Sequence, residues 1–187
     1  MQTSTILLIV VAVLVVASAG WFLYHLQRST QLRRRFGPEY ERTLSEAGDR
    51  RTAESDLVRR AKRLERLEIR PLSPAEKEKF LVEWRSTQVL FVVDDPVSAV
   101  YDANRLVNDI MTSRGYTSTN TSERMENISA AYPRAVSSYR EACGILEDYQ
   151  DGRASRESLR RALVSYRTLF DELLGESREE YRRVRVS

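Results

Sequence analysis

An unbroken apolar segment near the start of the chain limits what this sequence can fold into. Residues 6–24 carry no charged side chain, and a cluster of arginines follows them closely. These nineteen residues would extend over roughly 28 Å as an α-helix, close to the hydrocarbon thickness of a bilayer. Such a helix has no polar face to turn toward water, so it does not suit a soluble bundle. The segment therefore predicts a transmembrane anchor over residues 1–27.

A cleaved secretory signal is the alternative for the same segment. Ala17-Ser18-Ala19 has the small-x-small form that precedes signal-peptidase cleavage, which would leave Gly20 as the new N-terminus. However, residues 1–5 carry no Lys or Arg, and the apolar run continues from Trp21 to Tyr24 beyond that cut. Trp and Tyr side chains suit the headgroup layer. The anchor is therefore favoured, with a secreted or periplasmic domain as the alternative.

The distribution of charge predicts the orientation of the anchor. Residues 1–36 contribute +4, from arginines alone, and the whole chain carries +3, so residues 37–187 carry −1. Because positive flanks stay in the cytoplasm, we expect a single-pass protein of the cell membrane with its N-terminus outside and its C-terminal domain cytoplasmic. Arg33, Arg34 and Arg35 are predicted to contact anionic lipid headgroups. The nearly neutral remainder offers no basic face for nucleic acid.

The residues after the anchor predict an all-α fold. A basic juxtamembrane linker over 28–37 leads into one helical domain over 38–175, and a charged, frayed tail follows over 176–187. Glycine and proline are scarce and mostly fall at the ends of helical segments, and short connections favour antiparallel neighbours. The predicted fold class is therefore an N-terminal transmembrane helix followed by a soluble antiparallel helical bundle of about four long helices and one short helix.

Capping residues and apolar stripes define these helices. Ser73-Pro74 followed by Glu76 predicts a capping box, Asp95-Pro96 predicts a second start, and Pro133 predicts a third. Gly48 predicts a break in the first helical stretch. Apolar residues three or four apart mark the faces that a bundle must bury. These faces are Phe80, Trp84, Thr87 and Phe91; Val100, Ala103, Val107 and Ile110; Val136, Tyr139, Cys143, Leu146 and Tyr149; and Leu159, Leu163, Tyr166, Phe170 and Leu173.

The sequence contains no recognisable catalytic motif. His25 and Cys143 are the only residues of their kinds, and no Glu-x-x-His pair is present for a carboxylate-bridged metal centre. We therefore predict no catalytic, cofactor-binding or metal-binding residues and no cofactor. The predicted function is that of a non-catalytic, membrane-anchored interaction module. A helical-bundle enzyme without a recognisable motif is the alternative.

One helix stands out as a candidate docking surface for a protein partner or a second copy of the chain. Residues 49–68 carry a narrow stripe of Ala53, Leu57, Ala61 and Leu64 with arginines crowded on both sides. Alternating charges beside a narrow apolar stripe are typical of the flanks of a coiled coil. We therefore predict that Leu57, Ala61 and Leu64 form the partner or self-association face. A solvated helix that merely lies on the bundle is the alternative.

Several short motifs together resemble an uncharacterised family of bacterial single-pass membrane proteins. They are Gly37-Pro38-Glu39-Tyr40, Ile69-Arg70-Pro71-Leu72-Ser73, Phe91 with Asp94-Asp95-Pro96, Arg114-Gly115-Tyr116, and Tyr166-Arg167-Thr168-Leu169-Phe170 with Leu173-Leu174. The resemblance implies an anchor followed by helices and brings no known activity. Histidines typical of that family's last two long helices are replaced here by Tyr132, Ser138, Cys143 and Ser165.

Overall fold

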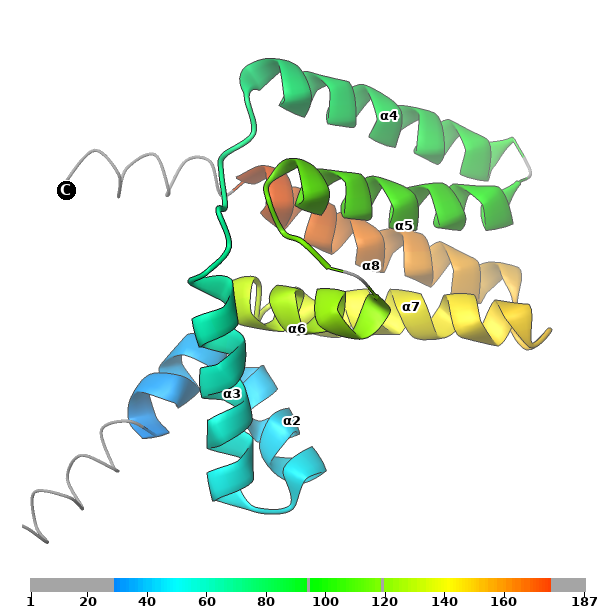
Figure 1. Cartoon of the computed structure of the whole chain (residues 1–187). Coiled ribbons are helices and arrows are strands. Elements are labelled where there is room, and N and C mark those ends of the chain that lie inside the picture. Colours follow the sequence, from blue (N-terminus) through cyan, green and yellow to red (C-terminus); the bar gives the residue numbers. More distant parts are fainter. Residues whose placement is uncertain (1–28, 94, 119, 176–187) are drawn as a thin grey trace, which may run out of the picture. The chain divides into compact units, whose positions relative to one another are not determined.

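The computed structural model describes residues 29–93, 95–118 and 120–175. Every regular element in these ranges is helical, which confirms the all-α prediction for this part of the chain (Figure 1). The predicted span 6–24, His25 and the tail 176–187 lie outside it. Among the described helices, none is long and apolar enough to cross a bilayer. Residues 29–36 are helical and precede α2 (Pro38–Ala47), α3 (Arg50–Leu64), α4 (Pro74–Val92), α5 (Pro96–Ser113), α6 (Thr121–Ala131), α7 (Val136–Gln150) and α8 (Arg156–Gly175).

The capping box at the start of α4 forms as predicted. The Glu76 amide donates to Ser73 Oγ at 3.2 Å, and the Ser73 amide donates to Glu76 Oε2 at 2.8 Å. Ion pairing with Arg70, together with the hydrogen bonds from Ser73, lowers the pKa of Glu76 to about 2. At the start of α5, the Ser98 amide donates to Asp95 Oδ1 at 3.0 Å, so the second predicted cap is confirmed.

One predicted helix start is displaced in the structure. α7 begins at Val136 instead of Pro133, because residues 133–135 form a turn in which the Ala135 amide donates to the Tyr132 carbonyl at 3.0 Å. Proline fits the second position of such a turn as well as it fits the first turn of a helix. α6 begins at Thr121, where Asn120 caps it by accepting from the Glu123 amide at 2.9 Å.

The contacts within the chain form two compact units, one up to Val58 and one from Arg59 onward. The boundary falls inside α3, whereas the sequence predicted one domain over 38–175. Gly48, with φ of +73°, ends α2 and so provides the predicted break. The first unit buries Leu32, Phe36, Tyr40, Ala53 and Leu57.

A buried polar network joins the helices of the first unit. Tyr40 Oη donates to Glu54 Oε1 at 2.9 Å, and Arg50 Nε donates to the same oxygen at 2.8 Å. Ser29 Oγ lies 3.2 Å from Tyr40 Oη. Burial raises the pKa of Glu54, but hydrogen bonds from Arg50, Ser29 and Tyr40 outweigh it and hold the pKa below the ordinary value. The ionised carboxylate is therefore the form that stabilises this unit.

We expect Glu54→Gln to weaken the first unit in a pH-dependent way. Because the folded-state pKa of Glu54 is lowered, its contribution is complete above the ordinary pKa of 4.5 and is lost as the pH falls through the lower folded value. At pH 7 the variant should lose about 1 kcal/mol, and wild type and variant should converge in acid. Amide hydrogen exchange in α2 and the first turns of α3 would measure this. A difference that stays constant with pH would contradict it.

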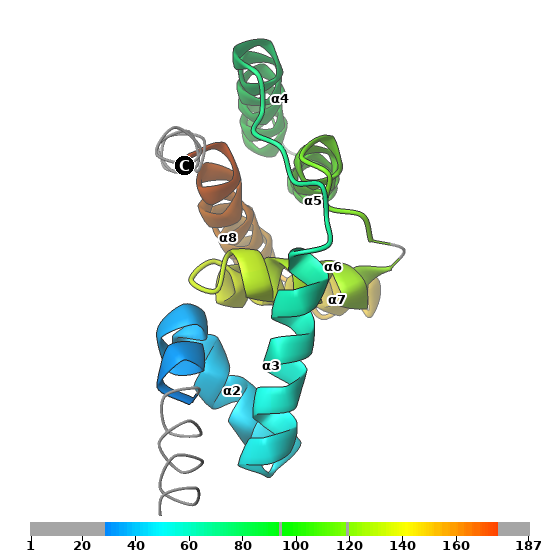
Figure 2. The same ribbon diagram turned by 60° about the vertical axis from the view of Figure 1, so that its left-hand side comes forward.

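The long helices of the second unit lie in the order α4, α5, α8 and α7, with α6 against α7 (Figures 1 and 2). The consecutive pairs α4–α5 and α7–α8 are antiparallel hairpins, as the short connections predicted. Their apolar faces meet in one core, where the Trp84 and Phe170 rings stack with centroids 4.6 Å apart. Over residues 38–175, the described part of the chain forms seven helices, α2 to α8, whereas about four long helices and one short helix were predicted.

The packing of α5 on α8 differs from the predicted antiparallel arrangement. Arg114, at the C-terminal end of α5, reaches the Leu173 carbonyl in the last turn of α8, so the two helices run parallel. At the opposite end, Gln150 of α7 donates to Tyr101 near the start of α5. The parallel pair arises because α6 and its connections lie between α5 and α7 in the chain, which leaves α8 to pack beside α5.

Candidate interaction surface

The outer face of α4 carries an exposed stripe of valines. Val82, Val89 and Val92 are 49%, 60% and 78% exposed, and Val93, directly after the helix, is 67% exposed. Tyr101, Tyr149 and Val164 are the other exposed large apolar residues in the described part of the chain. We call Val82, Val89, Val92 and Val93 the valine face. Four of these seven exposed residues therefore gather on one helix and its end.

The inner face of the same helix is fully used by the core. Phe80, Trp84 and Thr87 are buried, as the predicted stripe required, and Phe91 is half-buried. α4 lies at the edge of the helix array of the second unit and packs mainly on α5, so no other described helix of that unit covers its outer side (Figure 2). Valine is a poor helix former on an exposed surface. The packing and helix propensity of α4 therefore do not explain the valine face.

The predicted docking stripe on α3 is buried instead of exposed. Leu57 is 0% exposed and Ala61 is 6% exposed, while Leu64 is half-buried against the core of the second unit. The narrowness of the stripe, which suggested a helix with little to bury, reflects small side chains that allow close packing. Leu57, Ala61 and Leu64 are thus occupied within the chain, in contrast to the prediction.

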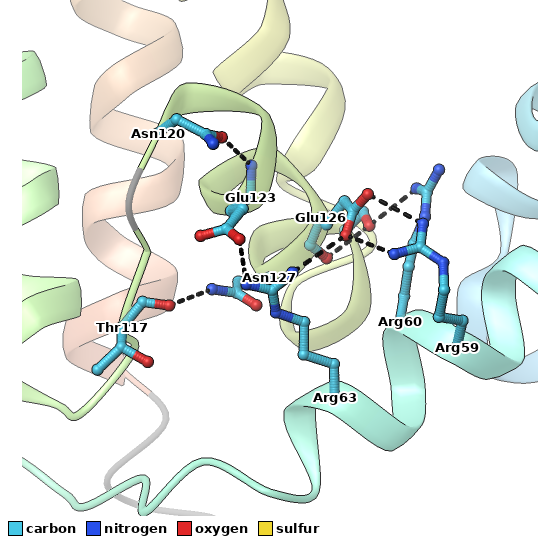
Figure 3. A network of polar contacts seen from close by, with 9 residues as sticks. Arg59, Arg60, Arg63, Thr117, Asn120, Glu123, Glu126 and Asn127 are labelled. Atoms are coloured by element: carbon cyan, nitrogen blue, oxygen red, sulfur yellow. Dashed lines mark hydrogen bonds and ion pairs between the residues drawn. The ribbon is translucent and has the colours of Figure 1, made fainter.

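Two of the arginines beside that stripe form ion pairs with α6 (Figure 3). Arg59 Nη2 lies 3.0 Å from Glu126 Oε1, and Arg63 Nη2 lies 2.7 Å from Glu123 Oε1. Arg60 Nη1 also donates to Ser129 Oγ on α6 at 3.1 Å. The arginines that were interpreted as the flank of a coiled coil therefore bind the last turns of α3 to α6, through ion pairs and a hydrogen bond.

A buried arginine closes the C-terminal end of α8. Arg114 is 1% exposed, and its Nη1 donates to Tyr132 Oη at 2.7 Å and to the Leu173 carbonyl at 2.9 Å. The last carbonyls of a helix have no amide partner within it, and they form the negative end of the helix dipole. The guanidinium satisfies both needs. Arg114 therefore has a structural role that the sequence motif Arg114-Gly115-Tyr116 did not predict.

Cys143 lies half-buried against the core, as its place on the α7 stripe predicted. Its Sγ is 3.8 Å from Tyr166 Oη. Burial raises the pKa of the Cys143 thiol, so the neutral thiol prevails at physiological pH. In the described ranges, no three His, Cys, Asp or Glu side chains come together in a way that could hold a metal ion.

The three arginines predicted to contact lipid are exposed on the helix over residues 29–36. Arg33 lies over the Tyr40 ring at 5.0 Å and 3.6 Å from Glu41, while Arg35 lies 5.9 Å from the centroid of the Phe36 ring. Their guanidinium groups are therefore accessible, and lipid contact stays a prediction.

Comparison of the chain with known families, with curated proteins and with solved structures gave no match.

Proposed function

We propose that this chain is a membrane-anchored helical module that acts by binding another protein chain and not by catalysis. The valine face of α4 is the observation that carries the proposal. Contiguous exposed apolar residues on a folded unit typically mark an interaction site. In the proposal, residues 6–24 hold the chain in the membrane with the described helices on the cytoplasmic side.

The exposed arginines after the anchor support this placement. Arg33, Arg34 and Arg35 follow the apolar segment within a dozen residues, and each contributes about 1 kcal/mol near an anionic surface. They would hold the first unit near the headgroups. The second unit would present α4 to a partner.

A photo-reactive amino acid at Val89 tests the binding surface. In cells that express the full-length chain, we expect position 89 to crosslink to protein in the membrane fraction, because Val89 lies at the centre of the valine face. The matched control is position 112, since Thr112 is exposed on α5 away from that face. Equal crosslinking at both positions, or none at position 89, would contradict the proposed surface.

The same cells test the anchor. We expect the full-length chain to stay in the membrane fraction after an alkaline wash, because an uncleaved span is not extracted by charge or pH. A mature chain that begins at Gly20 and is recovered outside the membrane would instead establish the exported alternative.

A further inference from the structure

We infer that the partner of the Val82 and Val89 part of the valine face is a second copy of this chain, bound through α4 in an antiparallel arrangement. This inference rests on the proposed function and names the partner for the same surface. Three features of α4 carry it: the spacing of its exposed apolar residues, the placement of two exposed charges, and the symmetry that relates them.

The apolar residues follow a seven-residue spacing. Ala75, Val82 and Val89 lie seven residues apart, and all three are exposed. Val92 follows three residues after Val89. Residues seven apart form a single line along a helix, and valine at such positions is typical of helices that pair in coiled coils. The line is narrow enough to be covered by one further helix.

Two charged residues lie within the same line of α4. Glu78 and Arg85 are themselves seven residues apart, with opposite charges, and their side chains are 66% and 67% exposed. Within one chain their nearest atoms are 3.9 Å apart, so the pair is loose and open to solvent. Any helix that covers the valine face must therefore accommodate one acid and one base at defined positions.

An antiparallel second copy of α4 accommodates both charges, because it places a base beside Glu78 and an acid beside Arg85. Ala75 and Val89 lie seven residues on either side of Val82, so a two-fold axis beside Val82 brings Val89 of each copy opposite Ala75 of the other. Glu78 lies four residues before Val82 and Arg85 lies three residues after it. The same axis therefore brings Glu78 to within one residue, about 1.5 Å along the helix, of Arg85 in the other copy.

A parallel pair of α4 helices does not place opposite charges beside each other. In parallel register, Glu78 faces Glu78 and Arg85 faces Arg85, and both contacts are repulsive. The antiparallel pair instead has two attractive contacts, two Val89–Ala75 contacts and one Val82–Val82 contact. It is isologous, so it closes as a dimer. Tethering to one membrane raises the effective concentration of the copies, which suits a contact limited to one helix from each.

Cysteine crosslinking of the full-length chain in lipid vesicles tests the arrangement. With Cys143→Ala as background, the only cysteines are those introduced at positions 75, 82 or 89. We expect oxidation to join Val82→Cys chains to each other and to join Ala75→Cys chains to Val89→Cys chains. Val89→Cys chains alone should remain monomeric. Crosslinking of Val89→Cys chains to each other, with none between Ala75→Cys and Val89→Cys chains in the mixture, would establish a parallel pair and overturn the inference.

Charge reversal supplies the matched controls. In the Val82→Cys background, Glu78→Arg and Arg85→Glu should each lower the crosslinked yield about tenfold, because each replaces two attractions by two repulsions. The double variant Glu78→Arg, Arg85→Glu should restore the yield, as should a mixture of the two single variants. Equal yields from wild type and both single variants would contradict the antiparallel register.

Failure of this inference is distinguishable from failure of the proposed function. A chain that gives no cysteine crosslinks, but whose position 89 is crosslinked by the photo-reactive group to a different protein, would refute self-association and leave the binding surface in place. A chain that gives neither would refute both. Val82→Gln with Val89→Gln should abolish the dimer without unfolding the helix, because glutamine has the higher helix propensity.

Discussion

Replacing Arg114 by methionine is expected to lower the free energy of unfolding of the second unit by about 3 kcal/mol. The side chains are similar in length, so the loss comes from polar contacts. Tyr132 Oη and the Leu173 carbonyl each lose the hydrogen bond that Arg114 Nη1 donates. For a chain of this size, the loss corresponds to a fall of roughly 10 °C in the unfolding temperature.

The matched control for Arg114→Met is Arg105→Met on the same helix. Arg105 is 58% exposed and pairs only with Asp102 and Asp109 at 3.3 Å. Exposed pairs of this kind contribute little, so the control should change stability by no more than about 0.5 kcal/mol. Amide hydrogen exchange in α5 and α8 of the full chain would measure both variants. Equal losses of stability in the two variants would show that Arg114 does not cap the C-terminal end of α8.

Gly115→Ala is expected to destabilise the second unit by about 3 kcal/mol or more, through backbone geometry. Gly115 has φ of +92°, which L side chains rarely adopt. A Cβ atom there would also overlap the backbone carbonyl of Glu68, which lies between α3 and α4. The neighbouring Arg70 amide donates to the Arg114 carbonyl at 2.9 Å, so this connection cannot retreat without losing a hydrogen bond.

Gly144→Ala provides the opposite outcome in the same protein. Gly144 lies inside α7, and a Cβ atom there would meet no atom within 4 Å apart from the nearby backbone of its own helix. Alanine should therefore stabilise α7 by about 0.5–1 kcal/mol through helix propensity alone. Thermal unfolding of the two variants, followed by circular dichroism of the full chain, would compare them. Similar effects of the two substitutions would contradict the close approach at Gly115.

Local features of the sequence predicted most of the helix ends. Ser73 and Asp95 cap the helices they were expected to cap, because the hydrogen bonds of a cap connect residues only three positions apart. The turn at Pro133 was misassigned because proline occupies the start of a turn and the start of a helix equally well. Local sequence features therefore identify the positions at which a helix can begin. They do not always show at which of these positions the helix does begin.

The candidate interaction surface was harder to predict from the sequence than the helix ends were. The stripe of Leu57 and Ala61 suggested an exposed face, yet both residues are buried, whereas Val82 and Val89 are exposed beside a broad buried stripe on the same helix. The signal for the valine face was present as a second line of apolar residues seven apart on α4. It did not stand out, because a helix with apolar residues on several sides is compatible with complete burial.

The sequence by itself determined that the described part of the chain is all-helical, and it showed an apolar segment long enough to span a bilayer and apolar stripes that must be buried. Only the tertiary structure decided that α5 packs parallel to α8, that Arg114 closes a helix 59 residues away, and that α4 keeps its outer face open. The physical reason is that spacing along a helix specifies which side chains share a face. Which distant surface covers that face depends on contacts between residues far apart in the chain.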